Sequence, residues 1–127
     1  MFLAVGTFVL FLEREPGVKK LSAAQIAELL SHDSSIVLID VRTPEEWSGE
    51  SGHLLNALSI PLSDLPAQLP VLEQYRSRPL VLYCRSGSRS SKATKLLMDR
   101  GFNAINMVGG IRQWSAAGYQ VIREDHR

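Results

Sequence analysis

The sequence predicts an α/β domain with a mostly parallel central sheet and helices on both faces. Residues 36–39 and 80–83 are continuous apolar runs, as found in strands that are covered on both sides. Residues 102–108 give a further strand, and segments with helical patterns separate these runs along the chain. Because strands that alternate with helices favour parallel pairing, this order predicts a sheet wrapped on both sides.

The composition is that of one globular domain. The chain has 127 residues, of which 45% are hydrophobic and 21% charged, and its net charge is only +1. A single cysteine excludes an intrachain disulfide and a metal site made of several cysteines. The three histidines are far apart and have no metal-ligand spacing. We therefore expect no metal site and no cofactor.

Met1 to Leu12 are uncharged and almost wholly apolar, and a polar linker follows them up to about Lys20. At about 1.5 Å per helical residue, this segment is too short for a bilayer core of about 30 Å. It also lacks the basic start and cleavage site of a signal peptide. Three alternatives remain open: the tail of an anchor truncated upstream, a segment that docks on a membrane surface or a partner, or an element packed on the domain. We expect this segment with its linker at 1–19 and the domain at 20–127.

Two capping boxes predict the first helices. Residues 22–25 (SAAQ) open a helix that should end near His32. Residues 43–46 (TPEE) open a short helix that carries Trp47. Between these helices, Asp40 ends the strand at 36–39, at the carboxyl edge where open α/β sheets bind their ligands.

The later elements follow from spacing, proline and glycine. His53 is expected to be structural, and residues 57–60 form a short strand closed by Pro61. Residues 65–75 have helical spacing, and the two prolines at positions 66 and 70 must sit in first turns or divide the helix. The remaining expected elements are a helical pattern from Lys92 to about Arg100 with Gly101 at the C-cap, the strand at 102–108, and a helix at 111–117 closed by Gly118.

Residues 80–95 organise the chain as strand, tight loop and helix. The strand ends at Cys84, and residues 85–91 (RSGSRSS) have turn chemistry and no large apolar side chain. Backbone N–H groups of such a loop can converge on one point, which also faces the positive end of the following helix. A thiol at that point is pushed towards thiolate, because such surroundings lower the pKa of a cysteine.

Basic residues gather around this loop. Between Gln74 and Met98 there are six basic residues and no acidic one. In a chain that is nearly neutral, this local excess predicts an electropositive pocket for a small anion rather than a nucleic-acid surface. The alternative, that Cys84 is only a buried apolar residue at a strand end, is disfavoured by the loop that follows it.

Four segments resemble the signatures of one family. Residues 84–89 (CRSGSR) resemble the active-site loop of rhodanese-homology domains, the thiosulfate sulfurtransferases and their single-domain relatives. The other three segments are similar to the family's remaining signatures and occur in the same order, over about residues 20–121: 40–47 (DVRTPEEW), 52–57 with 60–61 (GHLLNA and IP), and 109–114 (GGIRQW). The chain departs from the family at Leu55-Asn56, where the second signature usually has Pro-Gly.

The resemblance implies a sulfurtransferase of the rhodanese type. The Cys84 thiolate would take the outer sulfur of an anionic donor such as thiosulfate and form a persulfide. Cyanide or a thiol would then accept this sulfur. Arg89 is expected to hold the anionic donor, with Arg85 as a second, more exposed charge, because a guanidinium can bond two oxygens of an oxyanion.

The other candidate residues support this loop. Ser86, Ser88 and Ser90 could donate hydroxyl groups to the persulfide, although the expected role of Ser90 is to cap the helix. Gly87 provides backbone freedom in the tight turn. Asp40 and Arg42 are expected to be a structural ion pair or loop anchor near the site, in preference to a direct catalytic role.

Two other functions compete with sulfur transfer. Cysteine phosphatases use a related loop with five residues between cysteine and arginine, whereas Cys84 and Arg89 are separated by only four, which disfavours phosphate chemistry. A sulfur-relay or partner-docking module stays open as the alternative. We expect a small anionic sulfur donor, a thiol acceptor, no nucleic acid, and a monomer or weak dimer, with membrane contact through Met1 to Leu12 left open. A reactive thiol without disulfides favours the cytoplasm.

Overall fold

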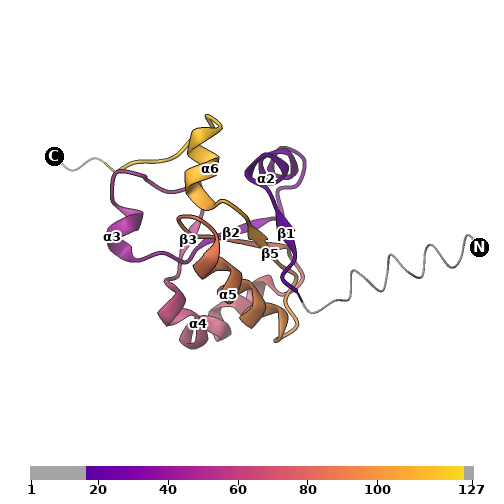
Figure 1. Cartoon of the computed structure of the whole chain (residues 1–127). Coiled ribbons are helices and arrows are strands. Elements are labelled where there is room, and N and C mark those ends of the chain that lie inside the picture. Colours follow the sequence, from indigo (N-terminus) through magenta and orange to yellow (C-terminus); the bar gives the residue numbers. More distant parts are fainter. Residues whose placement is uncertain (1–16, 125–127) are drawn as a thin grey trace, which may run out of the picture.

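A computed structural model describes residues 17–124. In this part of the chain, five parallel strands form one sheet in the order β1-β5-β4-β2-β3 (Figure 1). The strands are β1 (Lys20–Leu21), β2 (Val37–Asp40), β3 (Leu58–Ser59), β4 (Leu80–Tyr83) and β5 (Ala104–Met107). The predicted α/β fold with a parallel sheet is confirmed.

Helices cover both faces of this sheet. The helices are α2 (Ala23–Leu30) and α6 (Gly110–Ala116) on one face, and α4 (Leu65–Leu72) and α5 (Ser88–Met98) on the other (Figure 1). Successive residues of a strand point to opposite faces. On β4, therefore, Val81 and Tyr83 pack in the core on the α2/α6 side, whereas Leu82 and Cys84 pack in the core on the α4/α5 side.

Both predicted capping boxes are present. The Ser22 hydroxyl accepts a hydrogen bond from the backbone N–H of Gln25, whose side-chain oxygen accepts one from the backbone N–H of Ser22. Thr43 and Glu46 make the same reciprocal pair at the start of α3 (Pro44–Trp47), with Pro44 in the first turn. These local hydrogen bonds satisfy N–H groups that a helix start otherwise leaves unpaired.

α5 begins and ends earlier than predicted. Its first residue is Ser88, ahead of the pattern that starts at Lys92, because Gly87 takes the N-cap position in a left-handed conformation (φ 113°). The helix ends at Met98, with Asp99 and not Gly101 at the C-cap. The loop after Cys84 is therefore shorter than the sequence indicated, and several of its serines belong to the first turns of α5.

The proline-containing helix is shorter than the predicted 65–75. Pro66 lies in the first turn of α4 as expected, whereas Pro70 is inside the helix and neither starts nor divides it. Two 3-10 turns flank α4, namely η1 (Leu62–Asp64) and η2 (Glu73–Tyr75). Proline lacks an N–H group and costs an intrahelical hydrogen bond, which fits a helix of only eight residues.

The departure at Leu55-Asn56 leaves a well-formed turn. The N–H of Ala57 donates to the carbonyl oxygen of Leu54 over 3.2 Å, and Asn56 has a φ of 65°. A positive φ at the third residue alone is typical of a type II turn, for which Pro-Gly is the preferred central pair. Asparagine tolerates this left-handed conformation better than most residues, so the turn forms without Pro-Gly.

β2 and β4 lie at the point where the order of the strands reverses. After β2 the chain moves outward to β3, then returns to the other side of β2 to form β4 and β5. Asp40 at the end of β2 pairs in register with Tyr83 at the end of β4. Open α/β sheets bind ligands outside the carboxyl ends of the strands at such a reversal. Cys84 immediately follows this position.

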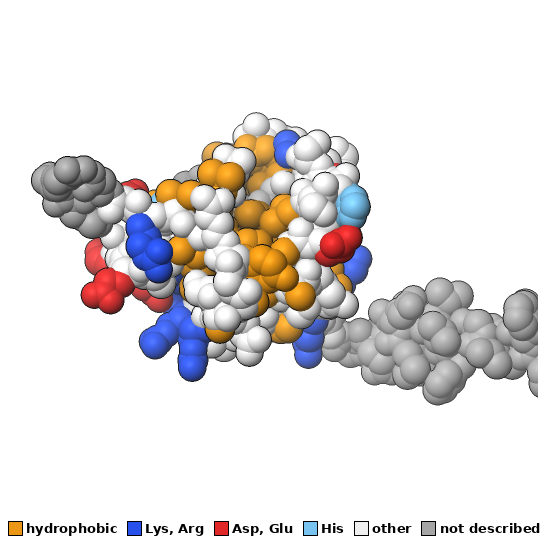
Figure 2. Space-filling model, turned by 90° about the horizontal axis from the view of Figure 1, so that it is seen from above, with side chains coloured by type: hydrophobic (Ala, Val, Ile, Leu, Met, Phe, Trp, Pro, Cys, Tyr) orange, Lys and Arg blue, Asp and Glu red, His pale blue; other side chains and the backbone are white. Residues whose placement is uncertain are grey.

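The face formed by α2 and α6 is hollowed. Seen from above, hydrophobic side chains fill the middle of this face (Figure 2). A cavity of about 410 Å³ lies there, and its lining includes Leu30, Ile36, Leu54 and Trp114 as well as Leu55, which is 56% exposed. The apolar segment Met1 to Leu12 lies outside the described residues. Among residues 17–124, no helix has the length and apolar character needed to cross a membrane.

Candidate active site

Cys84 lies at the carboxyl end of the central strand β4 and is 1% exposed. Three groups donate hydrogen bonds to its sulfur, of which the shortest is the backbone N–H of Gly87 at 3.0 Å. The N–H and the hydroxyl of Ser90 lie 3.5 and 3.4 Å from the same sulfur. The predicted convergence of loop donors on one atom is therefore present, and that atom is Cys84 Sγ.

The surroundings of Cys84 act on its pKa in opposite directions. Burial is the largest single effect and raises the pKa of the thiol. Hydrogen bonds from the Ser90 hydroxyl and from the backbone N–H groups of Ser90, Gly87 and Ser86 act against it and together leave the pKa of Cys84 below its usual value. The sulfur is thus buried among donors that stabilise a negative charge on it.

Ser90 does not cap α5, contrary to the prediction. Its hydroxyl is buried and lies 2.6 Å from Asn106 Oδ1 on β5, and it also reaches the Cys84 sulfur. The Asn106 amide nitrogen donates to the carbonyl oxygen of Gly87 over 3.3 Å. Ser90 cannot cap because Gly87 already occupies the N-cap position, and its side chain instead links the loop to the sheet.

Asn106 is a residue that the sequence analysis missed. It is one of two asparagines in the otherwise apolar stretch 102–108, and it is 3% exposed. A buried amide inside a central strand needs hydrogen-bond partners, because burial without them is costly. An asparagine in a predicted central strand therefore indicates a buried hydrogen-bonded site. The sequence does not indicate that its partners are Ser90 and Gly87.

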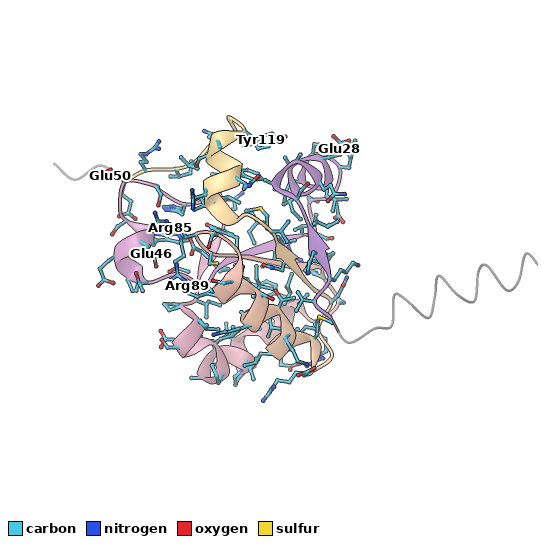
Figure 3. The ribbon with its side chains drawn as sticks, in the orientation of Figure 1. Glu28, Glu46, Glu50, Arg85, Arg89 and Tyr119 are labelled. Carbon is cyan, nitrogen blue, oxygen red and sulfur yellow. The ribbon has the colours of Figure 1, made fainter. Side chains whose placement is uncertain are left out.

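Arg89 is held by a carboxylate. Its two terminal nitrogens lie 2.7 and 2.9 Å from the two carboxylate oxygens of Glu46 on α3, in a bidentate ion pair. The hydrogen bond from Arg89 is the main reason why the pKa of Glu46 falls from 4.5 to about 2. Glu46 was predicted only as part of the capping box, whereas its carboxylate also anchors the loop arginine. Figure 3 shows Glu46 and Arg89 side by side, below Arg85.

Asp40 and Arg42 form the structural ion pair that was expected. Both side chains are 1% exposed, and Arg42 donates three hydrogen bonds to the Asp40 carboxylate, at 2.7, 2.9 and 3.1 Å. Arg42 also donates to the Ser51 hydroxyl and to the carbonyl oxygen of Gly52. The pair therefore fixes the 49–53 segment against the end of β2. His53 is buried and stacks on Trp47 with 3.6 Å between ring centroids, as a structural residue.

The start of α6 closes over the cysteine loop. The backbone N–H groups of Ile111 and Arg112 donate to the carbonyl oxygens of Cys84 and Arg85 at 2.9 and 3.1 Å. Gly110 makes this approach possible, because a Cβ atom there would lie 2.4 Å from both of these carbonyl oxygens. The last signature in the sequence, GGIRQW, thus holds the active-site signature, CRSGSR, in place.

The exposed loop residues border two hollows. Arg85 lines a cleft of about 540 Å³, and Ser86 lines a neighbouring one of about 370 Å³. Ser88 is exposed at the first position of α5. Of the predicted loop residues, Gly87 and Ser90 therefore contact the Cys84 sulfur directly. The backbone N–H of Ser86 also acts on the thiol, whereas the side chains of Arg85, Ser86 and Ser88 are exposed around it. Within residues 17–124, no group of histidine, cysteine and acidic side chains could hold a metal ion.

The chain is similar in sequence and in fold to known proteins. The sequence pattern of the rhodanese-like domain matches residues 22–117. A sulfurtransferase from Allochromatium vinosum is 30% identical over 83% of this chain and 95% of its own. A crystal structure of a rhodanese-related protein from Thermoplasma volcanium superposes with a TM-score of 0.75 and 31% identity, over 84% of this chain and 99% of that one.

The same domain also occurs within larger proteins. A tRNA uridine(34) hydroxylase from Cronobacter sakazakii is 35% identical over 75% of this chain, which corresponds to only 28% of that protein. The family therefore includes proteins with different overall activities, and membership alone does not define a substrate. On the match to residues 22–117 and the likeness to the Allochromatium vinosum sulfurtransferase, the chain belongs to the rhodanese-like family of sulfurtransferases.

Proposed function

We propose that this protein transfers a sulfane sulfur from thiosulfate, or a similar anionic donor, to a thiophilic acceptor through a persulfide on Cys84. The observation that carries the proposal is the set of donors around the Cys84 sulfur, namely the N–H groups of Gly87 and Ser90 and the Ser90 hydroxyl. They stabilise a sulfur anion at the end of the central strand, which is the species that both half-reactions require.

In the first half-reaction, the Cys84 thiolate attacks the outer sulfur of thiosulfate. A bond forms between Cys84 Sγ and that sulfur, and the sulfur–sulfur bond of thiosulfate breaks with its electron pair leaving on sulfite. The negative charge moves from Sγ to the new outer sulfur. Fixed donors that need no rearrangement favour such a step, and one donor is typically worth about 3 kcal/mol in a transition state.

In the second half-reaction, the acceptor attacks the outer sulfur of the persulfide. The bond between this sulfur and Cys84 Sγ breaks, and Sγ leaves as the thiolate that began the cycle. Gly87 and Ser90 therefore stabilise the leaving group in this step and the nucleophile in the first. With cyanide as the acceptor the product is thiocyanate.

Arginines around the loop supply the charge for an anionic donor. Arg89 is close enough for its guanidinium and the Cys84 thiolate to attract each other, although Glu46 neutralises part of its charge. Arg85 is exposed on the outer side of the loop. We assign Arg89 to the electrostatic stabilisation of the bound anion and Arg85 to its capture at the rim.

The test is steady-state turnover with thiosulfate and cyanide. The proposal predicts ping-pong kinetics, with parallel lines in double-reciprocal plots, because sulfite leaves before cyanide reacts. Cys84→Ser should abolish thiocyanate formation, while Ser91→Ala, a change at a neighbouring serine of α5, should retain it. Intersecting lines, or turnover that survives Cys84→Ser, would exclude a Cys84 persulfide cycle.

The apolar hollow supports a second candidate, a sulfur-relay module that docks a partner protein. The lining of the hollow between α2 and α6 includes Leu55, which is 56% exposed, and a docked partner would cover this side chain. A relay protein would take sulfur from a protein persulfide much faster than from free thiosulfate. Comparing the rates of Cys84 loading from the two donors decides between the candidates. A reducing compartment, such as the cytoplasm, would suit either one, because Cys84 must stay reduced between cycles.

A further inference from the structure

Beside the cysteine loop lies a cleft of about 540 Å³ with an unusual concentration of arginine. It lies within the range of about 300–1,000 Å³ that encloses small organic ligands. A small inorganic anion such as thiosulfate does not need this space. The residues that line the cleft are Arg42, Glu46, Gly49, Glu50, Ser51, Arg85, Ile111, Arg112, Ser115 and Arg123.

This cleft borders the cysteine loop on two sides. Glu46, on its wall, holds Arg89 of the loop, and Ile111, on the opposite element, donates its N–H to the carbonyl oxygen of Cys84. Arg85, the residue after the cysteine, is itself part of the lining. Figure 3 places Glu46, Glu50 and Arg85 on the same side of the molecule, next to α3.

The uncompensated charge in the cleft is positive. Arg42 is neutralised by Asp40, and Glu46 by Arg89. This leaves three guanidinium groups, on Arg85, Arg112 and Arg123, against the single carboxylate of Glu50. Within residues 17–124, the side chains of Arg85 and Arg112 make no hydrogen bond or ion pair with another residue, and both are exposed. Arg123 is also exposed, and it donates one hydrogen bond from Nε to the backbone carbonyl oxygen of Glu50, over 2.6 Å, which leaves its two terminal nitrogens for a ligand. Guanidinium groups in this state are suited to carboxylate ligands, which they bind bidentately.

We propose that this cleft binds the sulfur acceptor and that the acceptor is a small organic thiol carrying carboxylate groups. The inference rests on the proposed function, because it concerns the second half-reaction. Arg112 and Arg123 bind the carboxylates, and the acceptor thiolate is thereby brought to the mouth of the loop. The thiolate attacks the outer sulfur of the Cys84 persulfide, a new sulfur–sulfur bond forms on the acceptor, and the electron pair of the broken bond returns to Cys84 Sγ.

The experiment measures the second half-reaction alone. Protein loaded with thiosulfate and freed of excess donor is mixed with mercaptosuccinate, which has two carboxylates, or with neutral 2-mercaptoethanol. The rates are corrected for the thiolate fraction of each compound. The readout is the ratio of the two second-order rate constants in the wild-type protein, in Arg112→Gln and Arg123→Gln, and in the control Arg100→Gln, which lies beyond the far end of α5.

The expected result is a ratio above one in the wild-type protein that falls about tenfold in Arg112→Gln, the loss typical of one charge-assisted hydrogen bond. It should fall similarly in Arg123→Gln and stay unchanged in Arg100→Gln. A wild-type ratio near or below one would overturn the assignment. So would equal losses with both thiols, because a merely structural change in the loop slows them alike.

A binding measurement keeps this test separate from the proposed function. The S-methyl derivative of mercaptosuccinate cannot accept sulfur, and its binding is measured by calorimetry with unloaded protein. If thiosulfate fails to load Cys84 but this compound binds in an Arg112-dependent manner, the thiosulfate cycle is wrong and the cleft assignment stands. If Cys84 loads normally but the compound does not bind, the cleft assignment is wrong and the proposed function stands.

Discussion

The Ser90 hydroxyl has one proton and three acceptors within reach. These are Asn106 Oδ1 at 2.6 Å, the carbonyl oxygen of Gly87 at 3.3 Å and Cys84 Sγ at 3.4 Å. With a neutral thiol, the shortest contact takes the proton. Ionisation of Cys84 makes its sulfur the strongest acceptor of the three. The Ser90 hydroxyl then donates its hydrogen bond to the negatively charged Cys84 Sγ.

Replacing Ser90 with alanine should raise the pKa of Cys84. The change removes a donor to the thiolate, and hydrogen bonds to the charged form are what hold this pKa down. The rate of alkylation by iodoacetamide at neutral pH should fall between about two- and tenfold, as expected for one hydrogen bond. Ser91→Ala is the control. An unchanged pH profile in Ser90→Ala would show that the hydroxyl does not serve the thiolate.

Asp40→Ala should unfold the protein more readily than Arg42→Met combined with Asp40→Leu. The single change leaves the Arg42 guanidinium, which is 1% exposed, without its partner. Breaking one side of a buried ion pair typically costs about 3–5 kcal/mol, whereas replacing both partners with apolar residues costs much less. Urea unfolding measures the difference. If Asp40→Ala lost no more stability than the double variant, Asp40 would not be needed to compensate the buried charge of Arg42.

At the scale of elements, the start of α6 positions the cysteine loop by direct backbone contact. Gly110 has a φ of 59°, and alanine there would place its Cβ 2.4 Å from the carbonyl oxygens of Cys84 and Arg85. Gly118 is a matched control, because its φ is 89° and a Cβ there would meet nothing within 4 Å. Both substitutions incur the cost of a left-handed alanine, about 1–2 kcal/mol. Only one of them also creates a clash.

Gly110→Ala should therefore destabilise the protein more than Gly118→Ala and also change the reactivity of Cys84. The loop must move away from α6 to make room for the methyl group, and its N–H groups then lose their alignment with the sulfur. Urea unfolding and the alkylation rate are measured on both variants. Equal stability losses with unchanged alkylation would show that α6 does not position the loop.

The elements that local rules specify were predicted best. Ser22 and Thr43 start helices through hydrogen bonds to residues three positions on, and β4 is bounded by Pro79 and Cys84. β1 was missed because two residues carry no pattern of their own, and the pairing with β5 defines the strand. The start of α5 was placed too late because the conformation of Gly87, not the helix propensity of the serines, determines it.

The candidate site was predictable where it is continuous in sequence. Cys84, Gly87 and the convergence of N–H groups follow from one loop. The ion pair between Glu46 and Arg89 spans 43 positions and joins two elements that only the folded sheet brings together. The link from Ser90 to Asn106 depends in the same way on the neighbouring positions of β4 and β5. Predicting such contacts requires knowledge of the order of the strands in the sheet. A single sequence indicates this order only through its resemblance to a family of known fold.

At the scale of the whole molecule, the ion pair between Glu46 and Arg89 ties α3 to the start of α5 and makes stability depend on pH. Arg89 lowers the pKa of Glu46 to about 2, from 4.5 when the group is unperturbed. A carboxyl whose pKa is depressed by folding stabilises the native state above its unfolded pKa. This contribution is lost as the pH falls from 4.5 towards 2.

Glu46→Gln should therefore flatten the pH dependence of stability over this acidic range. The wild-type urea midpoint should fall more steeply with decreasing pH than that of the variant. Glu45→Gln, one position earlier on α3 and exposed, is the control and should keep the wild-type slope. Parallel curves for wild type and Glu46→Gln would mean that the ion pair does not form in solution.

The central claim is that Cys84 carries the sulfur, and the most direct measurement is the intact mass of the protein after brief exposure to thiosulfate. The account predicts a gain of about one sulfur atom (~32 Da) that is absent in Cys84→Ser and removed by a thiol. Loading from a protein persulfide is run in parallel. A gain in Cys84→Ser, or no gain from any donor in the wild-type protein, would contradict the persulfide mechanism.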